Sequence, residues 1–239
     1  MGLAMNVLIA IVVIVALYWI FNWFMGGGST KLSGMQDGRQ AVTLAASKLP
    51  SNNNTNNYTY STWVYVNDWN YRFGEQKTIV ERRDATGAFS PNIALGAMQN
   101  NLIVSTAVYP TTSGSSSSSA PINHTCTIDN IPLQKWVNII ISLNGRTMDV
   151  YINGKLVRTC VLPGVAKVNP SAPVLITPGG GFSGWSSETT YRANSINPQE
   201  AWNIYSDGFG GNFLGNLFNK YRVRVSFIED NVSRGSFEI

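Results

Sequence analysis

The chain has 239 residues, of which 44% are hydrophobic and only 13% are charged. Its formal net charge is +4, and the basic residues are spread along the sequence instead of gathering in one region. Binding to nucleic acid needs a concentrated basic patch, so this class of function is excluded and we expect no nucleic-acid partner. The nearest approach to a basic run is Arg82-Arg83, which we interpret as a solvent-exposed strand end.

The N-terminal segment predicts a membrane anchor over residues 1–25. Residues 7–21 are wholly apolar, and only Asn6 and Asn22 interrupt the stretch 3–25, which is expected to contact membrane lipid. A helix of this length rises about 35 Å, enough to cross a hydrocarbon core of about 30 Å. Aromatic residues at its C-terminal end are typical of a membrane interface. Representative residues of the predicted anchor are Val7, Ile14, Trp19, Phe21 and Trp23.

A cleaved signal peptide is the alternative to an anchor. The chain lacks the basic n-region of a signal peptide, and MGGGST is a poor cleavage site after bulky aromatic residues. No basic residue precedes the anchor, whereas Lys31, Arg39 and Lys48 follow it, so the positive-inside rule favours a large domain on the cytosolic side. Residues 26–37 are rich in glycine and serine, which predicts a flexible linker.

From residue 38 onward, short segments rich in apolar and β-branched residues alternate with turn-forming residues, as strands do. Residues 51–59 and 111–121 are predicted to be polar loops. A single helix is predicted after the anchor, over 197–208, because Asn197 can cap it and Pro198 suits its first position. The predicted strands lie within residues 39–50, 58–69, 75–82, 91–98, 101–109, 122–128, 135–160, 172–177, 186–194, 220–228 and 235–239.

The stretch 135–160 has the most regular pattern in the chain. Apolar and polar residues alternate on both sides of two Asn-Gly pairs, Asn144-Gly145 and Asn153-Gly154. Alternation with a period of two predicts half-buried strands, and Asn-Gly supplies the positive φ angles of a type I′ hairpin turn. The stretch therefore predicts three successive antiparallel strands. Together with the other short strands, it predicts a mainly β, antiparallel sandwich over 38–239, long enough to bury a substantial core.

The stretch LQKWVNIIISLNGRTMDVYINGKLVRTC resembles the signature meander of laminin-G-like and pentraxin-like domains in the concanavalin A-like lectin/glucanase superfamily. The matching features are Trp136 ahead of a strand and the turn that contains Tyr151, Asn153, Gly154 and Lys155. The stretch GFSGWSSETTYRANSINPQEAWNIYSDG is similar to a later strand and short helix of the same family. The resemblance covers about residues 38–239 and implies a jelly roll of two packed antiparallel sheets.

Two further stretches, residues 49–82 and 220–239, resemble membrane-anchored proteins of this fold in large DNA viruses of algae and protists. This resemblance implies a minor capsid protein of the virion, tethered to the viral inner membrane and bound to other capsid proteins. It implies a single-pass membrane protein between that membrane and the capsid, with the C-terminal domain on the cytosolic or capsid side. The sheet faces and the loops at 51–59 and 111–121 are expected to make the protein–protein contacts.

Catalysis is not expected from this sequence. Glucanases of this fold carry a Glu-x-Asp-x-x-Glu strand, whose carboxylates act as acid and nucleophile, and this spacing does not occur here. The nearest acidic cluster, from Glu81 to Asp84, is interpreted as a strand end followed by a turn. One histidine and two cysteines provide no metal site, so we expect a non-enzymatic protein without a cofactor.

A surface lectin or adhesin that binds carbohydrate is the alternative function. Sugar binding needs exposed aromatic rings beside polar groups, and the stretch NDWNYRF, residues 67–73, contains both. The competing interpretation is that some of these rings fill the core of the sandwich. The candidate glycan-binding residues are Asp68, Trp69, Tyr71 and Phe73.

The two cysteines and the glycosylation sequons bear on which side of a membrane the domain lies. Cys126 and Cys160 are candidates for a disulfide if adjacent strands of the meander bring them together, whereas in a cytosolic domain both would stay small buried hydrophobic residues. Both interpretations remain open. The sequons favour a lumenal or extracellular domain, against the positive-inside rule. They begin at Asn53, Asn57, Asn123 and Asn231.

Overall fold

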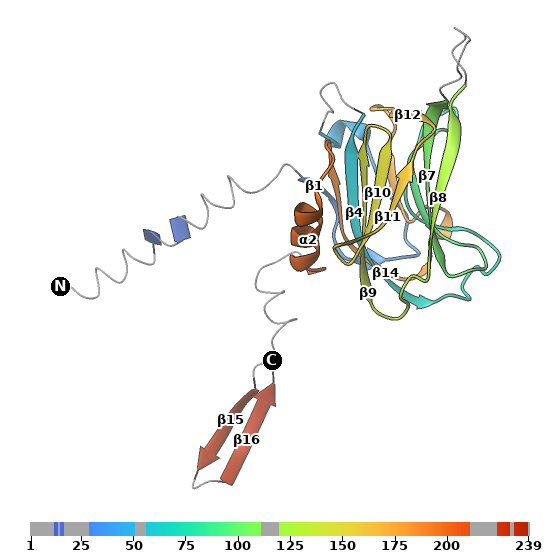
Figure 1. The fold of residues 1–239 in the computed structure, drawn as a ribbon. Coiled ribbons are helices and arrows are strands. Elements are labelled where there is room, and N and C mark those ends of the chain that lie inside the picture. The colour runs from blue at the N-terminus through green and yellow to red at the C-terminus, as the bar shows by residue number, and fades with distance from the viewer. Residues whose placement is uncertain are drawn as a thin grey trace.

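The structure is a computed structural model of the chain, and two antiparallel sheets packed face to face dominate it (Figure 1). This arrangement confirms the predicted antiparallel β-sandwich and is consistent with a jelly roll. The structure describes residues 12, 13, 15, 16, 29–50, 56–110 and 120–210, and the backbone alone of 224–229 and 232–238.

The first sheet has the strand order β1-β14-β4-β9-β10-β11, with β2 also paired to β14. Strands β9 to β11 are the predicted meander. The turn between β10 and β11 is Asn153-Gly154, with positive φ at both residues, as a type I′ turn requires. The strands are β1 (Ser29–Ser33), β2 (Gln36–Asp37), β4 (Tyr58–Asp68), β9 (Trp136–Asn144), β10 (Thr147–Ile152), β11 (Lys155–Val161) and β14 (Ser183–Arg192).

The first hairpin of the meander differs from the prediction. Asn144 pairs with Thr147, so the two-residue loop is Gly145-Arg146. Within this loop only Gly145 has a positive φ, which is the pattern of a type II′ turn. Asn144 belongs to the strand, so Gly145 is the first residue of the two-residue loop. In an Asn-Gly type I′ turn the glycine would be the second.

The second sheet has the strand order β12-β7-β6-β5-β13-β3, with β8 also paired to β7. Two 3-10 helices, η1 (Ala46–Lys48) and η2 (Pro178–Gly180), lie in the connections. A separate two-stranded antiparallel sheet is formed by β15 (Arg224–Glu229) and β16 (Val232–Glu238). The strands of the second large sheet are β3 (Val42–Leu44), β5 (Lys77–Arg83), β6 (Phe89–Leu95), β7 (Asn101–Pro110), β8 (Ile122–Asp129), β12 (Gly164–Ala166) and β13 (Val174–Ile176).

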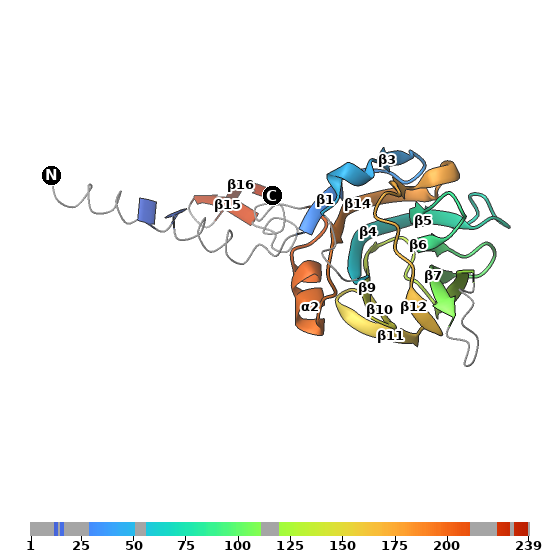
Figure 2. The same ribbon diagram turned by 90° about the horizontal axis from the view of Figure 1, so that it is seen from above.

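The core lies between the two large sheets, and Figure 2 views the sandwich from above with the strands arranged around it. On β9 the residues Val137, Ile139 and Ile141 are fully buried and alternate in position along the strand, so they face the core together. Ile93 and Val104, on neighbouring strands β6 and β7, are opposite each other in the second sheet and belong to the same apolar cluster.

Part of the segment 26–37, predicted as a flexible linker, is instead strand. β1 and β2 both pair with β14, and Thr30 lies opposite Tyr191. Leu32 is buried and belongs to the core. The backbone hydrogen bonds and the burial of this one apolar side chain hold the segment in the sheet, which its glycine and serine content did not predict.

Cys126 and Cys160 form a disulfide, with their Cα atoms 6.4 Å apart. They do not come from adjacent strands of the meander, as expected, but from β8 and β11, which belong to different sheets. The disulfide therefore connects the two layers of the sandwich. A hydrogen bond from a side chain to the backbone also joins β11 to β8, because Arg158 Nη1 donates to the carbonyl oxygen of Thr127 over 3.0 Å.

No helix within the described part of the chain is long and apolar enough to cross a membrane. Residues 12, 13, 15 and 16 are helical, and the rest of the predicted anchor lies outside the described residues. The anchor therefore stays a prediction. The same holds for residues 51–55 and 111–119 of the two predicted loops. It also holds for the other predicted sites that fall outside the described residues, namely Val7, Ile14, Trp19, Phe21, Trp23, Asn53 and Asn231.

Candidate binding surface on the outer face of the first sheet

The predicted glycan-binding group is divided between the core and the solvent. Trp69 packs partly against the core, and the ammonium of Lys77 lies 4.7 Å from the centre of its ring. Tyr71 donates its hydroxyl to the carbonyl oxygen of Gly180 over 3.0 Å. Phe73 is 60% exposed. Sugar binding by this group stays a prediction, and its three rings lie in different surroundings.

Asp68, the acidic member of this group, caps a local turn. It is the last residue of β4, and its Oδ1 accepts a hydrogen bond from the backbone N–H of Asn70 over 2.9 Å. Two of the predicted sequon asparagines also bond to nearby backbone. Asn57 Oδ1 accepts from the N–H of Gly145, and Asn123 Oδ1 accepts from the N–H of Phe89.

The acidic cluster from Glu81 to Asp84 is a strand end and turn, as interpreted from the sequence. Glu81 forms an ion pair with Arg83 at 3.0 Å, at the end of β5. Asp84 forms an ion pair with Lys167 and accepts hydrogen bonds from the turn that follows it. The pair Arg82-Arg83 was interpreted as a solvent-exposed strand end, and this is correct only for Arg83. Arg83 is exposed, whereas Arg82 is only 3% exposed.

A row of aromatic residues crosses three strands on the outer face of the first sheet. Trp185 on β14 lies opposite Tyr65 on β4, and Tyr65 lies opposite Trp136 on β9. Residues that are directly opposite in antiparallel strands point to the same face, so the three rings stand side by side. Asp37 on β2, opposite Trp185, places a carboxylate at the end of the same row.

Gly184 lets this row form. Its φ is +147°, and a Cβ atom at this position would stand 1.8 Å from the carbonyl oxygen of Tyr65. Any larger residue would push β14 away from β4 beside Trp185. The pairing register shifts at the same point, between Ser183 and Gly184, so the bulge fixes where the indole of Trp185 projects.

The helix α2 (Pro198–Ser206) covers the neighbouring part of this face, beside the first sheet in Figure 1. Its residue Ala201 is buried in a small cluster with Ile140 and Tyr151. Tyr205 stacks on Trp63, with ring centroids 5.5 Å apart and an interplanar angle of 23°. The face under α2 is therefore closed by apolar and aromatic packing.

The aromatic row beside α2 stays partly open. Phe209 stacks on Trp136 at 4.6 Å with an interplanar angle of 11° and so borders one end of the row. At the other end Trp185 is 48% exposed and Met35 is 58% exposed. These exposed side chains border a hollow of about 450 Å³, which we call the aromatic hollow. Its described lining consists of Met35, Tyr65, Trp136 and Trp185.

Only one residue that lines the aromatic hollow was singled out from the sequence, and it was not singled out as a binding residue. Trp136 was noted as a marker of the fold, whereas Met35, Tyr65 and Trp185 were not singled out. Alternation along β4 does indicate that Tyr65 faces away from the core, since Val64 and Val66 on either side are buried. The partners of Tyr65 depend on long-range strand pairing, which a single sequence does not reveal.

The fold is that of a lectin-like β-sandwich. A family model described as the concanavalin A-like lectin/glucanases superfamily matches residues 36–194, and the chain belongs to this superfamily. No curated protein matches the chain in sequence.

Solved structures with a similar fold include receptor-binding domains of neurotoxins. The receptor binding domain of botulinum neurotoxin D is 13% identical with a TM-score of 0.53, over 74% of this chain and 44% of that chain. The ligand binding domain of botulinum neurotoxin serotype D in complex with N-acetylneuraminic acid is 13% identical with a TM-score of 0.52, over 74% of this chain and 42% of that chain. The chain spans less than half the length of these structures, and the likeness shows the shared fold alone.

Proposed function

We propose that the sandwich is a non-catalytic docking domain that binds a partner protein through the aromatic hollow. The observation that carries the proposal is the exposure of Trp185 and Met35 beside a hollow of about 450 Å³. Tryptophan, tyrosine and methionine are enriched at the centres of protein interfaces, where a few such residues supply most of the binding energy. An apolar side chain of the partner would fill the hollow and remove these rings from water.

The chemistry of the lining favours a protein over a small polar ligand. Pockets for polar ligands combine apolar walls with several convergent polar groups. The described lining of the aromatic hollow offers only the indole N–H groups and one phenol as polar atoms. Asp37, at the end of the row, is the nearest carboxylate on the paired strands. Such a surface gains most of its binding energy from apolar burial.

The resemblance to membrane-anchored viral proteins suggests the setting and the partner. In this proposal the chain is a minor capsid protein of the virion, anchored in the viral inner membrane by residues 1–25. The sandwich lies on the capsid side, and the aromatic hollow contacts another capsid protein. The resemblance of residues 49–82 and 220–239, stated above, supports this part of the proposal.

The test compares two exposed tryptophans in purified particles. Detergent strips the membrane, and mass spectrometry measures how much of the full chain stays with the shell. We expect Trp185→Ala to reduce retention, by roughly 30-fold in affinity if Trp185 is a hot spot worth about 2 kcal/mol. Trp202→Ala is the matched control, because Trp202 is 46% exposed but lies on α2 outside the lining of the hollow. A chain that leaves with the lipid and cross-links to no shell protein would refute the proposal.

Carbohydrate binding is the second candidate, because Trp185 presents an exposed ring beside the carboxylate of Asp37. One of the similar structures was solved in complex with N-acetylneuraminic acid, which is a property of that protein. A glycan array probed with the full chain, with Trp185→Ala and with Phe73→Ala would decide it. Loss of binding in only one variant would assign the site to the hollow or to residues 67–73. A chain that binds no sugar on the array would remove the candidate.

A further inference from the structure

The guanidinium of Arg82 is buried without a carboxylate partner in the described part of the chain. Arg82 is 3% exposed, although it stands next to the exposed Arg83. Its Nε donates to the carbonyl oxygen of Ala172 over 3.1 Å, and its Nη2 donates to the carbonyl oxygen of Pro170 over 2.9 Å. The guanidinium also interacts with the hydroxyls of Tyr60 and Tyr191. Within the described residues, the charge is thus held by carbonyl dipoles and phenol hydroxyls and not by an anion.

Such a charge is costly to bury. Removing a cation from water is unfavourable unless an opposite charge or a full set of hydrogen bonds replaces the lost hydration. Arg83, by contrast, points to solvent and pairs with Glu81. The adjacent arginines of β5 therefore differ: one has a carboxylate and the other lacks it. This difference marks Arg82 as a group that an added anion would stabilise.

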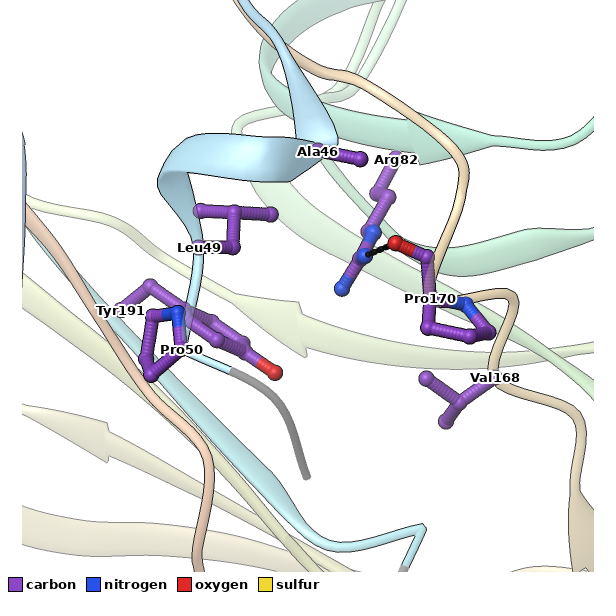
Figure 3. A pocket seen from close by; sticks show the side chains of 7 residues that line it. All are labelled: Ala46, Leu49, Pro50, Arg82, Val168, Pro170 and Tyr191. Atoms are coloured by element: carbon purple, nitrogen blue, oxygen red, sulfur yellow. Dashed lines mark hydrogen bonds between the residues drawn. The ribbon is translucent and has the colours of Figure 1, made fainter. Parts of the chain in front are cut away.

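Arg82 borders a small cavity at the side of the sandwich core. The cavity has a volume of about 120 Å³. Figure 3 shows the guanidinium between Leu49 and Pro170, with the hydroxyl of Tyr191 directed toward the same space. The rest of the described wall is apolar. It is formed by Ala46, Leu49, Pro50, Val168 and Pro170.

Two phenols next to Arg82 are available as hydrogen-bond donors. The hydroxyls of Tyr60 and Tyr191 interact with the guanidinium of Arg82, and a phenol oxygen that accepts from a guanidinium still has its own proton to donate. The ring of Tyr60 lies 4.9 Å from the ring of Tyr191, and the centre of the Tyr191 ring lies 5.8 Å from the guanidinium carbon of Arg82. Burial raises the pKa of both phenols, so each keeps its proton at neutral pH. A neutral hydroxyl donates to an anion.

We propose that this cavity binds the carboxylate of a small aliphatic acid, with the anion on Arg82 and the alkyl group against the apolar wall. A volume of about 120 Å³ is well above the roughly 10–15 Å³ that one water molecule needs by this measure, so the cavity has room for a small acid. The guanidinium of Arg82 and the Tyr191 hydroxyl supply the donors for one carboxylate. Phosphate fits less well, because its additional oxygens would meet the alkyl walls formed by Leu49 and Val168.

This site is independent of the aromatic hollow. Arg82 and Tyr191 lie inside the sandwich, whereas Trp185 and Met35 lie on the outer face of the first sheet. Binding of a small acid would act on the folded domain as any ligand of the native state does, by raising its apparent stability.

The test measures thermal unfolding of the full chain in propionate, in chloride at equal ionic strength, and in inorganic phosphate. We expect propionate to raise Tm, by roughly 5 °C or more at 100 times its Kd. Chloride and phosphate should have smaller effects. Ala46→Leu fills the cavity without touching the charge and should abolish the response to propionate. Ala45→Leu is the matched control, since Ala45 is exposed and does not line the cavity, and it should keep the response.

A charge variant completes the test. Arg82→Met removes the cation and should remove the response to propionate, and if this variant does not fold, the pair of alanine variants decides the question alone. The proposal is overturned if propionate stabilises the chain no more than chloride does, or if Ala46→Leu responds as Ala45→Leu does. Equal stabilisation by phosphate would overturn the assignment to a carboxylate.

Discussion

Cys126 on β8 is bonded to Cys160 on β11, so a covalent link joins an edge strand of one sheet to an edge strand of the other. Strands at these positions have no further strand beside them within the described sheets. Another contact between β8 and β11 is the hydrogen bond from Arg158 to the carbonyl oxygen of Thr127. The disulfide therefore stands where separation of the sheets would begin.

We expect reduction of this disulfide to destabilise the domain. The two cysteines are 34 residues apart, and closing a loop of this length in the unfolded chain is worth about 4 kcal/mol in the chain-entropy model. Urea unfolding with and without a reductant measures the difference as a shift of the midpoint. The double variant Cys126→Ala/Cys160→Ala should unfold at the midpoint of the reduced protein. Equal midpoints for oxidised and reduced protein would contradict the expectation.

A second prediction concerns the contact between the β10–β11 turn and α2. Gly154 has a φ of +72°, and a Cβ atom there would stand 2.9 Å from Cβ of Tyr205. Gly145, in the preceding turn, has a φ of +59° but no atom within 4 Å of the same position. Both Gly→Ala variants carry the strain of a positive φ, about 1 kcal/mol, but only Gly154→Ala also pushes against the helix.

We therefore expect Gly154→Ala to lower the free energy of unfolding by about 1–2 kcal/mol more than Gly145→Ala does. Near-ultraviolet circular dichroism should change in the first variant only, because displacement of Tyr205 disturbs its stacking on Trp63. If both variants lose the same free energy of unfolding, α2 can move away from the turn without an energetic cost.

The meander shows which part of the fold is local enough to predict. Its strands are consecutive and its turns are short, so alternation and the glycines at 145 and 154 predict them directly. The pairing of β1 with β14 is different. Ser29 and Arg192 are far apart in the chain, and the glycines around β1 favour a flexible linker if only neighbouring residues are considered. Long-range hydrogen bonds override this local preference.

The candidate surface was less predictable for the same reason. Trp185, Tyr65 and Trp136 come from three separate parts of the sequence and form one row only through the registers of β14, β4 and β9. The stretch 67–73, in contrast, gathers aromatic residues within one loop, which attracts attention in the sequence. Its rings differ in burial, because Trp69 packs partly against the core whereas Phe73 is exposed to solvent.

Asp84 should make the stability of the domain fall in acid. The hydrogen bond from Lys167 and those from Thr86 and the backbone hold the pKa of its carboxyl well below the ordinary value of about 4. A carboxyl with a lowered pKa in the folded state stabilises that state fully above its unfolded pKa. This stabilisation is lost as the pH falls from about 4 toward the folded pKa.

The measurement is the urea midpoint at pH 7 and at pH 3. We expect the difference between the two pH values to be smaller in Asp84→Asn than in the unsubstituted chain, and we expect Asp84→Ala to cost about 2 kcal/mol at pH 7. The side chain of Asp84 is only 4% exposed, whereas that of Glu75, which pairs with Arg72, is 63% exposed. Glu75→Gln is therefore the control, and a change as large as that of Asp84→Asn would argue against a special role for Asp84.

The start of α2 affects the open surface beside it. Asn197 Oδ1 accepts from the N–H of Glu200 over 2.9 Å, and Glu200 Oε2 accepts from the N–H of Asn197 over 2.8 Å, which forms a capping box. Asn197→Ala removes the first of these bonds and should cost about 1 kcal/mol of helix stability. Because α2 carries Tyr205 over Trp63, its amides should then exchange hydrogen roughly five times faster.

Gln199→Ala provides the comparison for this last variant. Gln199 lies on the same helix turn, but its side chain makes only an exposed bond to Asn203 Oδ1, which is worth a few tenths of a kcal/mol. Hydrogen exchange measured by mass spectrometry should therefore separate the two variants on α2 and leave β4 unchanged in both. If Asn197→Ala also weakens docking at the aromatic hollow, the position of Phe209 on Trp136 depends on the helix, and α2 forms one wall of the binding surface. If docking is unchanged, the strands alone hold the row of rings in place.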